Sequence, residues 1–231
     1  MPAEPDGRRS AAAARRRARE TEIIGATRRL FDERGVRDAQ IEDIARAVGI
    51  NRAIVYRHFT GKEELFALTL VGYLDELRAE LEAGAAPAPG RTVAARLTST
   101  IEAFVAYGVA HPAFADCAQS LMRRTGPELL DELSESALLR LGRGISSCLA
   151  ILTALFDQGN EAGEFAVADP TLLANMLYAS GLGALQLARV GILVTEAAPG
   201  VPGVAPITAD QVRDHLVRSA LAQASRIATT P

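Results

Sequence analysis

The stretch Gln40–Phe66 reads QIEDIARAVGINRAIVYRHFTGKEELF, and it decides the fold of the N-terminal part of the chain. Apolar residues at helical spacing predict a short helix over Gln40–Val48 and a second one that ends near His58. Gly49 between them permits the left-handed backbone that lets two helices cross at a steep angle. Asn51 is a favourable N-cap for the second helix. We therefore predict a helix-turn-helix unit.

The second helix of this unit carries polar and basic side chains on its outer side, as a helix that enters the major groove of DNA would. We expect DNA contacts from Gln40, Asn51, Arg52, Ala53, Ile54, Tyr56, Arg57, His58 and Lys62. Arg52 and Arg57 are the candidates for reading guanine edges, and contact with phosphate alone is the alternative for both. For His58, the alternative to a backbone contact is an exposed surface histidine.

Lys62 is the only lysine among 25 basic residues. It opens the next predicted helix, where backbone N–H groups and the helix dipole favour a phosphate. A compact ammonium at a tight phosphate site explains why lysine rather than arginine stands here. A salt bridge to a neighbouring glutamate is the alternative.

Helical patterns on both sides of this unit predict an all-α chain of about nine helices. Residues 21–34 form an amphipathic first helix, which Gly35 ends. We expect a flexible Arg-rich arm over residues 1–20, with extension of the first helix from Ala11 as the alternative. The helix-turn-helix domain is expected over 21–66 and a larger helical domain over 67–231. The Gly- and Pro-rich stretch Gly191–Pro206 is expected to be a loop, and the last helix is expected to end near Ile227.

The distribution of charge favours a DNA-binding N-terminal part that is attached to a domain of another kind. The net charge is −3, which alone argues against DNA binding, but residues 1–66 hold fourteen Lys and Arg against eleven Asp and Glu. The remaining residues hold eleven against seventeen. The arginines of the arm have two interpretations, entry into an adjacent minor groove or a solvated tail that adds non-specific attraction.

Residues 21–70 resemble the TetR family of helix-turn-helix regulators at motif level. The matching residues are Phe31 with Gly35, Ile44-Ala45, Gly49-Ile50, Tyr56, Phe59 and Lys62, followed by Glu63, Glu64 and Leu65. The resemblance implies that Tyr56 and Lys62 contact phosphates. Three positions depart from the family pattern: Ala39-Gln40 stand where threonines are frequent, Ala53 where glycine is common, and Ile54 where threonine is common.

The resemblance also implies a C-terminal domain that binds a ligand and dimerises. Residues expected to border the ligand are Phe104, Tyr107, His111, Phe114, Cys148, Leu152, Phe156, Asn175 and Tyr178. Ordinary core packing is the alternative for each of them. The last two helices are expected to pair with those of a second copy through Leu173, Leu177, Gly181, Gly183, Ala184, Val212, Leu216 and Ala220.

The sequence thus predicts a homodimeric, ligand-responsive transcriptional repressor that binds a palindromic DNA operator and a small, largely apolar effector. An activator or a ligand-independent regulator of the same fold is the first alternative, and a helical enzyme with a structural helix-turn-helix is the second. We expect no enzyme activity, cofactor or metal, because catalytic and metal-ligand spacings are missing. Cys117 and Cys148 are expected to be buried thiols rather than a disulfide. The missing signal and span patterns predict a cytoplasmic protein without a membrane segment.

Overall fold

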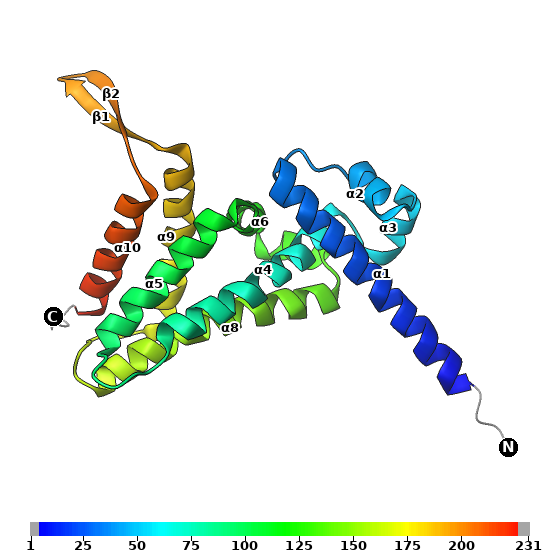
Figure 1. The fold of residues 1–231 in the computed structure, drawn as a ribbon, viewed down its shortest axis with the longest axis horizontal. Coiled ribbons are helices and arrows are strands. Elements are labelled where there is room, and N and C mark those ends of the chain that lie inside the picture. The colour runs from blue at the N-terminus through cyan, green and yellow to red at the C-terminus, as the bar shows by residue number, and fades with distance from the viewer. Residues whose placement is uncertain (1–4, 226–231) are drawn as a thin grey trace. The chain divides into compact units, whose positions relative to one another are not determined.

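A computed structural model describes residues 5–225, which form ten helices and one two-stranded hairpin (Figure 1). The helices are α1 (Pro5–Arg34), α2 (Ile41–Val48), α3 (Arg52–His58), α4 (Lys62–Ala85), α5 (Val93–Ala110), α6 (Pro112–Met122), α7 (Gly126–Glu132), α8 (Glu135–Glu161), α9 (Pro170–Val190) and α10 (Ala209–Ala224). The strands are β1 (Ile192–Ala198) and β2 (Val201–Pro206). The predicted all-α class is confirmed. Residues 1–4 of the expected arm and the expected helix end at Ile227 lie outside the described residues.

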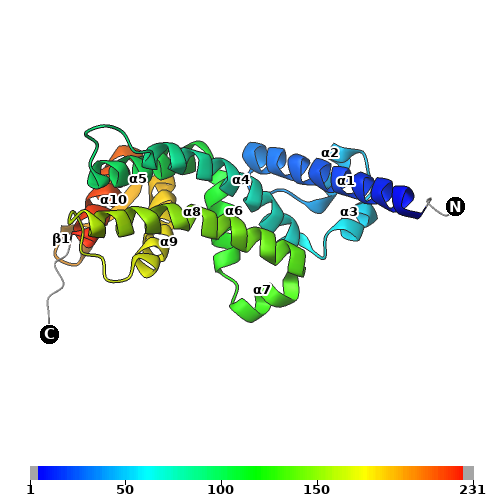
Figure 2. The same ribbon diagram turned by 90° about the horizontal axis from the view of Figure 1, so that it is seen from below.

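The chain divides into two compact units, and the first, here called the head, takes in Met1–Gly72 and Asp116–Leu141. Its core forms where the apolar faces of α1, α2, α3 and α4 meet. Ile23, Ile44 and Leu65 are fully buried there, and the rings of Phe31 and Phe66 meet edge to face at 4.9 Å. Figure 2 shows α7 as a short helix between α6 and α8. Residues 116–141, which include α7, belong to the same unit as the helix-turn-helix.

The second unit, here called the body, takes in Tyr73–Ala115 and Gly142–Pro231. Its helices are the later parts of α4 and α8 together with α5, α9 and α10, and α10 packs against α5 and α9. Among the described helices, α8 is long and apolar enough to span a membrane by length and composition, a test that core helices of soluble proteins also pass. Leu155 and Phe156 of α8 are buried within the body.

Helix α1 begins at Pro5, within the segment that was expected to be a flexible arm. Alanines and arginines are strong helix formers, so residues 11–19 can continue the amphipathic helix toward the N-terminus. Two ion pairs one turn apart support this extension, between Arg16 and Glu20 at 2.9 Å and between Arg19 and Glu22 at 2.7 Å.

The prediction of a loop over Gly191–Pro206 is wrong, because this stretch folds into the antiparallel hairpin β1–β2. Val194 lies opposite Val204, and such β-branched cross-strand pairs favour a sheet. Gly200 takes a positive φ of 77° in the turn, and its N–H donates to the Glu196 carboxylate at 2.7 Å. The hairpin connects the C-terminal end of α9 to the N-terminal end of α10 (Figure 1).

Candidate nucleic-acid interface and ligand cavity

The turn between α2 and α3 has the geometry that its sequence requires. Gly49 has φ 72° and ψ 30°, in the left-handed region, and ends α2. The Ile50 N–H donates to the Ala45 carbonyl at 2.9 Å, which closes the turn. The side chain of Asn51 accepts the Ile54 N–H at 3.0 Å, so the predicted N-cap is confirmed. These bonds fix the direction in which α3 leaves the head.

One face of α3 packs on the rest of the head, and the other face is open to solvent. Val55 is 1% exposed and faces the core. Arg52, Ala53, Tyr56 and Arg57 are exposed on the opposite side, with the half-buried Ile54 between the two faces. Gln40 is exposed directly before α2, and its side chain makes no capping hydrogen bond there. The structure therefore brings the predicted recognition residues of α3 together on one accessible surface.

The two candidate arginines of α3 lie in different surroundings. Arg52 donates to the Glu42 carboxylate of α2 at 2.6 Å and to the Tyr56 hydroxyl at 3.3 Å, and its guanidinium lies 5.2 Å from the centre of the Tyr56 ring. Arg57 is exposed one helical turn further along and lines an open groove of about 560 Å³ between α1 and α3. Arg15, Arg16 and Arg19 of α1 line the same groove. Arginines of α1 and α3 thus converge at one surface.

Two predicted contacts lie at the ends of this surface. His58 is half-buried, and its Nδ1 lies 3.5 Å from a carboxylate oxygen of Glu20, so it faces α1. Lys62 is the first residue of α4 and is exposed, with its Nζ 5.0 Å from the centre of the Phe66 ring. A cation held over a ring at a helix N-terminus can meet a phosphate without losing that contact.

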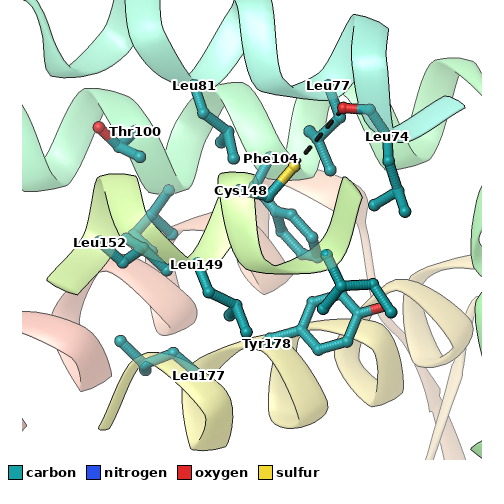
Figure 3. Close-up of a pocket in the computed structure, with 12 residues that line it drawn as sticks. Leu74, Leu77, Leu81, Thr100, Phe104, Cys148, Leu149, Leu152, Leu177 and Tyr178 are labelled. Carbon is teal, nitrogen blue, oxygen red and sulfur yellow. Dashed lines mark hydrogen bonds between the residues drawn. The ribbon is translucent and has the colours of Figure 1, made fainter. Parts of the chain in front are cut away.

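The body contains a small apolar cavity of about 40 Å³, bordered by four helices (Figure 3). Its walls are Leu74, Leu77 and Leu81 of α4, Thr100, Ile101 and Phe104 of α5, Ile145, Cys148, Leu149 and Leu152 of α8, and Leu177 and Tyr178 of α9. Two polar groups of the wall bond to backbone carbonyls: Thr100 Oγ1 to Arg96 at 2.9 Å and Cys148 Sγ to Leu74 at 3.5 Å. Burial raises the pKa of both Cys148 and Tyr178 to about 12, so both are neutral at pH 7.

Four of the residues expected around a ligand line this cavity, namely Phe104, Cys148, Leu152 and Tyr178. The other five lie elsewhere. Phe114 packs edge to face on Phe104 and Tyr107, Phe156 packs on Phe165, His111 lies against the Tyr107 ring, and Asn175 is exposed. The Tyr107 hydroxyl is already engaged with the Tyr73 carbonyl at 3.0 Å and the Glu76 carboxylate at 3.1 Å.

Sequence reasoning missed the leucines that α4 contributes to the cavity. Helical spacing predicts an apolar face over residues 62–83 that includes Leu77 and Leu81, but the spacing alone does not show that this face borders a cavity. Leu74 adds the backbone carbonyl that accepts the Cys148 thiol. The available signal was the length of the apolar face, which continues beyond the helix-turn-helix into the body.

The residues expected at a dimer interface fall into two groups. Leu177, Gly181, Val212, Leu216 and Ala220 are buried inside the same chain, while Leu173 and Ala184 are half-buried and Gly183 is exposed. Further exposed apolar residues of α9 are Leu172, Met176, Leu187 and Val190. Together with Gly183 they recur at helical spacing, so α9 presents an apolar stripe to the outside.

Residues 23–69 match the profile of the family described as bacterial regulatory proteins, tetR family. The transcriptional repressor KstR2 of Rhodococcus jostii strain RHA1 is 42% identical over 59 residues, which are 26% of this chain and 29% of that protein. The chain thus spans less than a third of the length of this curated relative.

Solved structures resemble the chain over most of its length. The regulator FadR of Bacillus subtilis, solved in complex with stearoyl-CoA, superposes with a TM-score of 0.61 at 15% identity over 88% of this chain and 98% of that one. RolR, solved with the ligand resorcinol, gives 0.63 at 16% identity over 94% and 92%. At these identities the likeness establishes the fold: an N-terminal helix-turn-helix followed by a helical domain.

Proposed function

We propose that the chain is a TetR-family regulator, a ligand-responsive repressor that binds a palindromic operator as a homodimer, because residues 23–69 match the profile of that family. The observation that carries this proposal is the accessible face of α3, where Arg52, Tyr56 and Arg57 stand beside Lys62. Two such faces in a symmetric dimer would enter successive major grooves. Repression is supported by KstR2, a transcriptional repressor whose matching segment is 42% identical to this chain.

In this proposal the basic residues divide into base-reading and phosphate-binding groups. Arg57 is exposed and reads a guanine edge. Arg52 pairs with Glu42, so it can read a base only if it gives up that ion pair. Otherwise its role is to hold the Tyr56 side chain in position for a phosphate contact. Lys62 binds a phosphate at the start of α4. The arginines of α1 that line the groove beside α3 add contacts along the backbone, as a helix rather than as a flexible arm.

The proposed dimer forms through the exposed apolar stripe of α9. A partner that covered Leu172, Met176, Leu187 and Val190 would remove a continuous apolar surface from water. The hairpin continues this surface, because Val194 and Val204 are 83% and 72% exposed on one of its faces. A two-stranded hairpin has little stability of its own in water, so we propose that the second copy covers this face as well.

The edges of the hairpin differ in a way that fits such an arrangement. The Ile207 N–H donates to the Gly191 carbonyl at 3.0 Å. Because hydrogen-bonded pairs alternate along an antiparallel ladder, the backbone groups of Pro202, Val204 and Pro206 then face away from β1, at the outer edge of β2. Two prolines leave that edge with few donors. The outer edge of β1 keeps its N–H groups, so β1 is the strand that can meet the partner.

The proposed effector is a largely apolar small molecule that binds between α4, α5, α8 and α9. The cavity of about 40 Å³ is far below the 300 Å³ or more of typical ligand pockets. Binding must therefore move its walls apart, which links the ligand to the positions of α4 and α8. The complexes of neighbouring folds with stearoyl-CoA and resorcinol support an apolar or aromatic class. Thr100, Cys148 and Tyr178 are the polar residues of the wall.

Binding of the purified protein to DNA upstream of its own gene tests the proposal. We expect a shifted band at nanomolar concentration, a footprint with two-fold symmetry, and release by one member of a panel of fatty acyl-CoA thioesters and phenols. Increased transcription in vitro from the bound promoter would identify an activator instead. Binding that no panel member changes would favour ligand-independent regulation. No specific binding would refute the assignment of α3 as a recognition helix and leave an enzyme as the alternative.

A further inference from the structure

Glu64 is a buried charge in the head. Among residues 10–225, whose side-chain exposure is described, it is the only buried acidic residue, with 4% of its surface exposed. A buried carboxylate is costly unless hydrogen bonds replace its lost hydration. Burial raises the pKa of Glu64, but hydrogen bonds from Ser134 and Thr60 outweigh that effect and leave the pKa below its ordinary value. Glu64 is therefore an anion held by specific donors.

These donors come from two places in the chain. The Thr60 N–H, in the turn between α3 and α4, donates to Glu64 Oε2 at 2.5 Å. The Ser134 hydroxyl, directly before α8, donates to Glu64 Oε1. Ser134 Oγ also accepts the Ala137 N–H at 3.3 Å and so caps α8. One carboxylate thus joins the start of α4 to the start of α8.

Neighbouring contacts repeat the same connection. The Thr60 hydroxyl donates to the Glu132 carbonyl at 2.9 Å. Arg124 forms ion pairs with Glu63 at 3.0 Å and with Glu132 at 3.2 Å. The Thr60–Glu132 bond and the Arg124–Glu63 pair join residues 60–64 to residues 124–134, and the Arg124–Glu132 pair holds the second segment together. All of these residues belong to the head. The turn that carries the chain from Arg57 to Lys62 is therefore held from outside the helix-turn-helix.

We propose that Glu64 and Ser134 form a latch, a buried hydrogen bond that positions the α3–α4 turn for operator binding. The inference rests on the proposed function. Glu64 touches no DNA itself and is a positioning residue, because it sets the spacing between the contacts of α3 and that of Lys62.

Ser134→Ala tests the latch, since it leaves the local bond between Glu64 and Thr60 in place. Ser134→Thr restores both the cap and the hydroxyl and is the rescue variant. Ser146→Ala is the matched control, because Ser146 is an exposed serine of α8 that bonds only to its own helix in the described contacts. Glu64→Gln keeps the shape of the side chain and removes the charge.

We expect Ser134→Ala and Glu64→Gln to weaken operator binding about tenfold, the scale of a hydrogen bond to a charged group, at a temperature where unfolding curves show both fully folded. Amide hydrogen exchange at Thr60 should accelerate in both, without DNA. Ser134→Thr and Ser146→Ala should match the wild type. The latch would be overturned if folded Ser134→Ala bound the operator and exchanged the Thr60 amide as the wild type does. It would also be overturned if the substitution changed the unfolding midpoint but neither operator affinity nor exchange. If the wild-type protein itself bound no operator, the proposed function would fail, and the exchange experiment would still decide whether the contact orders the turn.

Discussion

Replacement of Lys62 by alanine isolates the proposed phosphate contact at the start of α4. The side chain is exposed and lies over the Phe66 ring, so its loss removes little packing. Its stability cost is that of an exposed cation–π contact, about 0.5–1 kcal/mol. DNA binding should instead weaken for every sequence alike, because a phosphate contact carries no sequence information.

The magnitude follows from counterion release. Each lost phosphate contact lowers the slope of log K against log salt by about 0.9, so a dimer loses about 1.8. Between 50 and 200 mM salt, a fourfold increase, wild-type affinity should therefore fall about 12-fold more than that of Lys62→Ala.

Fluorescence anisotropy with a labelled operator, at four or more salt concentrations, measures both slopes. Arg78→Ala is the matched control, because Arg78 is an exposed basic residue of the same helix that pairs with Glu82 at 3.2 Å. An unchanged slope in Lys62→Ala would refute the phosphate contact. Equal slope changes in both variants would show an effect of net charge rather than of position.

Three further predictions concern the recognition helix, the dimer and the cavity. Arg57→Ala should cost about 1–3 kcal/mol of specific binding and relax base preference at one position of each half-site; wild-type preference across substituted operators would contradict base reading. Gly183→Arg should yield a folded monomer in sedimentation at micromolar concentration, because a Cβ there meets no other element of its own chain within 4 Å. Leu130→Arg, on the exposed side of α7, should stay dimeric, and a dimer in both variants would place the interface elsewhere. Leu152→Ala should lower the free energy of unfolding by about 2–5 kcal/mol and let benzene raise the melting temperature, unlike Leu139→Ala on the exposed side of α8; no response to benzene would contradict an expandable apolar cavity.

Local chemistry let the sequence predict the helix-turn-helix. Gly49 is the residue that a left-handed turn requires, Asn51 is an N-cap that bonds within four residues, and both act over one turn of chain. The accessible face of α3 follows from the same periodicity, since Val55 must point inward and Arg57 outward.

The tertiary structure decided everything that depends on which apolar faces meet. Periodicity marks Phe114 and Cys148 equally as buried, but only packing sends the first to an aromatic cluster and the second to the cavity. Packing likewise buries Ala220 within its own chain and leaves Met176 exposed. The contact between Glu64 and Ser134 joins residues that are 70 positions apart, through a pairing that no local pattern encodes. Helix and turn formation is settled by neighbours along the chain, whereas a cavity, an interface or a latch is settled by the free energy of burying surfaces that lie far apart in the sequence.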